Sequence, residues 1–206
     1  YQNLYDIFTI ILFFLLGIFI FIFSIGPNNE IFQEIGMGII WTLLLLSNNL
    51  SIKRFYQEDF KNGNLHLLNM SGMSYEIIVL IKLFANWLFL QIPFFIFIPI
   101  ACIILNIQND NMYLILFTFL IGSPILTSIA SISGSLNILN NRNTEIASLI
   151  VMLLSIPVII FSIGIIKAPP ELIKAQLSFL TGILLLFLSI TPWICSGCIK
   201  IAIRNS

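Results

Sequence analysis

Long apolar runs dominate the chain, and short polar stretches separate them. Six runs approach or exceed the roughly 20 residues that a helix needs to cross a bilayer. The predicted spans are residues 7–25, 35–52, 77–105, 112–139, 146–166 and 177–203. The runs are continuous, which favours helices over the alternating strands of a membrane barrel. We therefore predict an all-α integral membrane protein with a single transmembrane domain over residues 1–206.

The composition agrees with this prediction. Only 9% of the 206 residues are charged, 59% are hydrophobic and the mean hydropathy is +1.05. A typical soluble domain has about 25% charged residues. The formal net charge is zero, so no basic surface indicates a nucleic-acid partner.

Prolines interrupt two of the longest runs. Pro93 and Pro99 fall in the third predicted span, and Pro124 falls in the fourth. Proline removes a backbone donor and crowds the preceding turn, so we expect these helices to kink.

Lysine and arginine are unevenly distributed among the predicted loops. The loops at 26–34 and 106–111 have none, whereas the loop at 53–76, the loop at 140–145 and the C-terminal tail hold six between them. Basic residues favour the cytoplasmic side, so we expect both termini to be cytoplasmic. Lys167 and Lys174 depart from this rule, because their loop should then face outward.

The segment 53–66 concentrates charge. Five of the eighteen charged residues of the chain lie within positions 53–61. Ile52, Phe55, Tyr56 and Phe60 follow the spacing of one helix face, and Gly63 is a natural helix stop. We predict a short amphipathic helix at the cytoplasmic surface. A solvated loop with interfacial aromatic residues is the alternative.

An exposed helix of this kind is suited to docking a soluble partner, with aromatic side chains as anchors and charges setting the register. The chain has no G-x-x-x-x-G-K-[ST] motif, so we expect any ATP hydrolysis to be carried out by a separate ATPase subunit. The predicted interface residues are Phe55, Tyr56, Glu58, Asp59, Phe60, Gly63 and Leu65.

Small polar residues recur every four positions in the fourth predicted span. They are Ser123, Thr127, Ser131 and Ser135. This spacing lets two membrane helices approach closely, so we interpret it as a helix-packing stripe. A subunit interface or a substrate-lined path would produce the same pattern.

Three polar residues lie inside the third predicted span: Lys82, Asn86 and Gln91. Polar residues within a membrane span are candidates for function. Lys82 is close enough to the cytoplasmic end to extend its ammonium group into water. Asn86 and Gln91 can instead hydrogen-bond a neighbouring helix near the proline kinks.

Other candidate chemistry is sparse. His66 is the only histidine, so this chain alone cannot supply a pair of imidazole ligands to haem. Cys195 and Cys198 form a formal C-x-x-C within an apolar run, which favours packing over redox chemistry. We find no catalytic triad or metal-ligand cluster, and predict neither an enzyme nor a bound cofactor.

Several stretches together resemble the haem exporter protein B family (CcmB) of cytochrome c maturation. They are IGP at 25–27, IGMGIIW at 35–41, RFYQEDFKNGNL at 54–65, GSP at 122–124 and IPVIIF at 156–161. The resemblance extends over nearly the whole chain. Two positions depart from it: His66 stands where an acidic residue is expected, and Asn64 where serine is common.

The resemblance implies an ABC-type permease subunit with an ABC-2-like six-span fold. It would work with a cytosolic ATPase, a haem-handling membrane protein and a haem chaperone. Haem would be the cargo, and two copies of this subunit would form a homodimer. The complex would either carry haem or use ATP to release a loaded chaperone. A bacterial inner membrane is expected, with the mitochondrial inner membrane as the alternative. The residues also leave open a lipid or drug exporter, or a non-transporting scaffold.

Overall fold

The computed structural model describes residues 2–26, 28–51, 56–107, 112–139 and 144–205. Side chains are described for residues 7–26, 28–50, 56–107, 112–139 and 149–204. These parts of the chain form eight helices and contain no strand. The helices are α1 (Gln2–Ile25), α2 (Asn29–Ser51), α3 (Gln57–Lys61), α4 (Asn64–Met70), α5 (Tyr75–Ile104), α6 (Met112–Leu139), α7 (Thr144–Lys167) and α8 (Pro170–Asn205).

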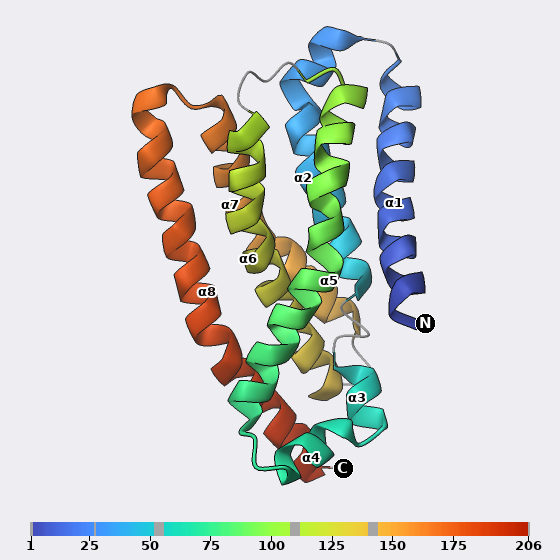
Figure 1. Cartoon of the computed structure of the whole chain (residues 1–206), viewed down its shortest axis with the longest axis vertical. Coiled ribbons are helices and arrows are strands. Elements are labelled where there is room, and N and C mark those ends of the chain that lie inside the picture. Colours follow the sequence, from blue (N-terminus) through green and yellow to red (C-terminus); the bar gives the residue numbers. More distant parts are fainter. Residues whose placement is uncertain (1, 27, 52–55, 108–111, 140–143, 206) are drawn as a thin grey trace.

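Six of these helices are long and apolar enough to cross a membrane, which confirms the predicted all-α, six-span fold. They run side by side along the long axis of the molecule, whereas α3 and α4 lie together at one end (Figure 1). The chain is therefore a multi-pass membrane protein with a small helical extension at one end of its bundle.

The helices begin and end beyond several predicted spans. Helix α2 begins at Asn29, within the predicted loop at 26–34, and α8 begins at Pro170, within the predicted loop at 167–176. Local hydrogen bonds explain one of these early starts, since the Asn28 side chain accepts a bond of 3.4 Å from the Ile31 amide. Hydropathy marks where a helix is apolar, whereas capping determines where it begins.

Helix α6 is the most enclosed of the six, and it packs against both α7 and α8. Its predicted stripe, Ser123, Thr127, Ser131 and Ser135, is completely buried within this chain. Two of these hydroxyls bond to the backbone of α6 itself: Thr127 donates to the Ser123 carbonyl and Ser135 to that of Ile132. The stripe is thus an internal packing surface.

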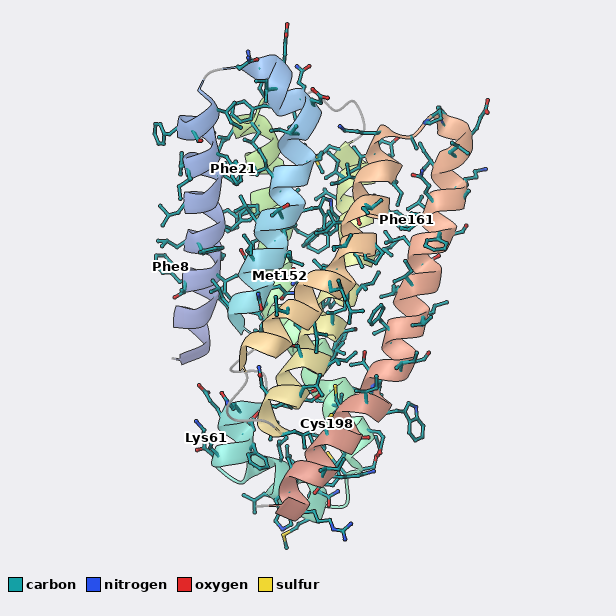
Figure 2. The ribbon with its side chains drawn as sticks, turned by 180° about the vertical axis from the view of Figure 1, so that it is seen from behind. Phe8, Phe21, Lys61, Met152, Phe161 and Cys198 are labelled. Atoms are coloured by element: carbon teal, nitrogen blue, oxygen red, sulfur yellow. The ribbon has the colours of Figure 1, made fainter. Side chains whose placement is uncertain are left out.

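The outer helices present apolar side chains outward. Figure 2 shows Phe8 on the outward side of α1, where 65% of its surface is exposed. On the inward side, Phe14 of α1 is fully buried and packs edge-to-face against Phe94 of α5, with ring centroids 5.1 Å apart. Exposed apolar side chains on long helices are what a lipid environment requires.

Candidate coupling site between the charged segment and the membrane helices

The charged segment forms two short helices instead of the single amphipathic helix predicted. Helix α3 ends at Lys61, and α4 begins at Asn64. Gly63 between them has a φ of 71°, a conformation that favours glycine, so its predicted role as a helix stop is confirmed. Asn64 donates a hydrogen bond of 3.1 Å to Asp59 across this turn. Phe55 lies outside the described residues.

Tyr56 faces the membrane helices and not the surface. Its side chain is fully buried, and its hydroxyl lies 2.8 Å from the Ser131 hydroxyl of α6. Ser131 also lies 3.5 Å from the Cys195 sulfur of α8. Burial raises the pKa of the Tyr56 phenol well above its usual value, so the group remains neutral. The expectation that Tyr56 is a surface anchor is therefore wrong, because its polar tip has a buried partner.

A small hydrophobic core holds the two short helices in place. Leu65 of α4 is 1% exposed, so it too packs inward and is not available at the surface. It belongs to a cluster separate from the main core of the bundle. The buried members of this cluster are Tyr56, Leu65, Ile78, Val79, Ile132, Ile138, Cys195, Ile199 and Ala202. The segment is thus built onto the ends of α5, α6 and α8.

Lys82 of α5 forms an ion pair with Asp59 of α3. Their side chains are 20% and 34% exposed, so the pair is partly shielded from water. The Lys82 ammonium also lies 5.3 Å from the centre of the Tyr56 ring, within reach of a cation–π interaction. Lys82 thus contacts two residues of the charged segment at once.

A second ion pair joins two of the long helices nearby. Lys200 of α8 lies 2.7 Å from Glu76 of α5, and its ammonium is 6.0 Å from the centre of the Tyr75 ring. This pair does not involve α3 or α4. It therefore joins the ends of α5 and α8, and its partly exposed side chains contribute little to stability.

A groove lies between the charged segment and the ends of α6 and α8. Its volume is about 550 Å³, and it is lined by Gln57, Phe60, Lys61, Gly63, Leu65, His66, Ile138 and Ile203. Glu58 is exposed and Phe60 is half-buried. Figure 2 places Lys61 at the outer edge of α3. Of the predicted interface residues, Glu58 is exposed, Asp59, Phe60 and Gly63 are partly exposed, and Tyr56 and Leu65 are buried.

The other polar residues of the third predicted span lie deeper in α5. Gln91 is 3% exposed and donates a hydrogen bond of 3.2 Å to Asn48 of α2. Trp87 donates one of 3.0 Å to Ser123 of α6. Within the described residues, the Asn86 amide nitrogen is buried without a hydrogen-bond partner. The sequence analysis singled out Gln91 but not its partner Asn48. Asn48 is also a polar residue within a predicted span, and that position could have identified it.

The side chains of this site mostly contact one another, and few of them could bind a metal ion or a cofactor. Among the described residues, no group of three or more His, Cys, Asp or Glu side chains is placed to hold a metal ion. His66 is exposed on α4 and lines the groove as its only imidazole. The described contacts instead join the charged segment to α5, α6 and α8.

The family match and the similar proteins all point to the same family. The CcmB protein family matches residues 2–202. "Heme exporter protein B" of Haemophilus influenzae is 30% identical, with 94% of this chain and 88% of that protein covered. "Putative cytochrome c biogenesis ccmB-like mitochondrial protein" of Marchantia polymorpha is 32% identical, with 92% and 66% covered. "Heme exporter protein B" of Escherichia coli is 26% identical, with 93% and 88% covered. The chain therefore belongs to the CcmB family.

Proposed function

We propose that this chain is the membrane permease subunit of a haem export system that serves the maturation of c-type cytochromes. Membership of the CcmB family supports this function, as do the relatives named heme exporter protein B. Relatives from bacteria and a mitochondrial relative favour a bacterial inner membrane or its mitochondrial counterpart.

The single observation that carries the mechanism is the attachment of the charged segment. A separate ATPase subunit would dock on the accessible part of α3 and its groove, where Glu58, Phe60 and Lys61 are presented. The inward face of the segment is bound to α5 and α6 through Lys82 and Ser131. Movement of the docked partner would then be passed to the membrane helices.

The orientation in the membrane follows from the charge distribution. Helices α3 and α4 and both termini lie toward the same end of the molecule (Figure 1). Lys61, Lys200 and Arg204 belong to elements at this end, which we assign to the cytoplasm. Lys167 lies at the other end of α7, where it donates a bond of 2.6 Å to the Glu34 carbonyl. Lys167 is one of the two lysines that the preference of basic residues for the cytoplasmic side does not explain, and this hydrogen bond gives its ammonium group a partner within the protein.

The complete complex would contain further components. We infer a haem-handling membrane protein and a haem chaperone as partners, with haem as cargo and not as a resident cofactor. A second copy of this chain would complete the transporter, because six spans usually form half of such an assembly. ATP hydrolysis is assigned to the ATPase subunit.

Deletion of the gene tests the cytochrome function. Cells lacking the gene should lose haem-stained c-type cytochromes and should regain them with a plasmid copy. Unchanged cytochromes would overturn the haem function and favour a permease for lipids or drugs.

Replacement of a groove residue tests ATP coupling. Phe60→Ala in the complementing copy should lower cytochrome formation while a tagged chain still captures its membrane partners. Leu67→Ala is the matched control, because Leu67 is exposed on α4 and does not line the groove. If Phe60→Ala leaves cytochromes normal, the groove does not couple ATP hydrolysis to export, and a non-transporting scaffold becomes the better reading.

A further inference from the structure

The lower half of α5, residues 75–91, makes a polar contact with a different element at each of four positions, and the first is the pair of Glu76 with Lys200 of α8. At the other three positions, Lys82 pairs with Asp59 of α3, Trp87 donates to Ser123 of α6, and Gln91 donates to Asn48 of α2. Helix α3 packs mainly on α6 and α4. The ion pair is therefore a direct polar link from α3 to α5.

Two prolines follow this half of the helix. Pro93 comes two residues after Gln91, and Pro99 lies a further turn and a half along α5. Each proline removes the backbone N–H that would bond to the carbonyl four residues earlier, which weakens the helix against bending. Figure 1 shows that α5 changes direction partway along its length. The lower half can therefore tilt about the proline region without movement of the upper half.

We propose that residues 75–91 of α5 act as a lever and that Lys82 is the positioning residue that ties this lever to α3. This inference rests on the proposed function, because the movement begins when the ATPase displaces α3. Displacement of Asp59 pulls Lys82 along, and α5 tilts below Pro93. The hydrogen bond between Gln91 and Asn48 then passes the movement of α5 to α2.

The surroundings of Lys82 favour joint movement of the two helices over separation of the pair. The Lys82 side chain is 20% exposed, and its ammonium is held between Asp59 and the Tyr56 ring. Separation would leave a partly buried charge without its counter-ion, which costs more than keeping the contact during a tilt. A purely apolar contact would slide more easily, because it is not directional.

Charge removal at Lys82 tests the proposal in cells that contain the whole complex. Lys82→Met should leave association with the ATPase and basal ATP hydrolysis unchanged, yet lower haem-stained c-type cytochromes about tenfold, which is within the usual range of coupling between sites. Asp59→Asn should reproduce this loss from the other side of the pair. Lys82→Arg keeps the charge and should retain the cytochromes.

Lys200→Met is the matched control. It removes the same charge from the other ion pair described on α5, which joins α5 to α8 and not to α3. It should match the parent chain in cytochromes, ATP hydrolysis and melting temperature. A Lys82→Met chain with normal cytochromes would overturn the proposal. Loss of ATPase association in Lys82→Met would also overturn it, because the pair would then hold the segment and not transmit its movement.

Spin labels test the tilt itself. Ile81 on the lower half of α5 and Leu16 on α1 are both exposed, while the described native cysteines are buried. The distance between labels at these positions should change when a non-hydrolysable ATP analogue binds the complex, and Lys82→Met should abolish the change. An unchanged distance in the parent complex would refute the lever. Failure of any ATPase to associate with the parent chain would instead refute the proposed function.

Discussion

The hydroxyl of Tyr56 lies 2.8 Å from that of Ser131, although the two residues are 75 positions apart. This bond fastens the charged segment to the middle membrane helix of the bundle, α6. Ser131 belongs to the buried stripe of small residues, so a stripe that packs helices together also receives the segment. Ser131 therefore takes part both in holding the charged segment on the bundle and in packing the membrane helices together.

Removal of the Tyr56 hydroxyl should weaken this attachment. Tyr56→Phe keeps the ring but removes the hydroxyl that lies against Ser131, which should lower the free energy of unfolding by about 1 kcal/mol. Thermal melting of the purified chain in detergent measures the change. Tyr113→Phe is the control, because Tyr113 is 72% exposed and should be neutral. Equal melting temperatures for both variants would contradict a stabilising bond.

The turn between α3 and α4 should be sensitive to any side chain. Gly63 has a φ of 71° with no atom within 4 Å of an added Cβ, so the cost of Gly63→Ala is conformational and not steric. We expect a loss of about 1 kcal/mol. Gly63→Asn should lose less, because asparagine tolerates this region.

Gly182→Ala is the matched control for Gly63. An added Cβ at Gly182 also meets nothing within 4 Å, but the residue lies within α8 at an ordinary helical φ. Alanine favours a helix interior by about 1 kcal/mol over glycine, so this variant should melt at the same or a higher temperature. Destabilisation by both substitutions to the same extent would argue against a conformational cause at Gly63.

The sequence predicted the long elements well and the contacts of the short segment poorly. Apolar run length was sufficient for six spans, and a four-residue spacing was sufficient for the buried stripe. The direction of Tyr56 could not be predicted, because an aromatic residue beside a membrane suits a bilayer, a partner or a buried hydroxyl equally well. The pairing of Lys82 with Asp59 depends on how α3 folds back toward α5, and local periodicity carries no information on that.

Close packing between α2 and α6 should not tolerate extra volume at Gly122. An added Cβ there would lie 2.6 Å from the Trp41 ring, and Trp41 is itself 2% exposed and has little room to move. Gly122→Ala should therefore destabilise the chain by about 1–3 kcal/mol. Gly197→Ala, with no atom within 4 Å, is the control. A melting temperature for Gly122→Ala equal to that of the control would mean that the indole can shift.

Membrane-impermeant thiol labelling should distinguish the two ends of the bundle. Asn62 at the α3–α4 turn and Gln33 near the start of α2 are both exposed, and the three native cysteines are buried, which keeps background labelling low. In intact cells with a permeable outer membrane, Gln33→Cys should be labelled from outside. Asn62→Cys should react only after the inner membrane is opened. The reverse pattern would place the charged segment outside the cell, away from any cytosolic ATPase, and would contradict both the orientation and the docking role assigned to α3.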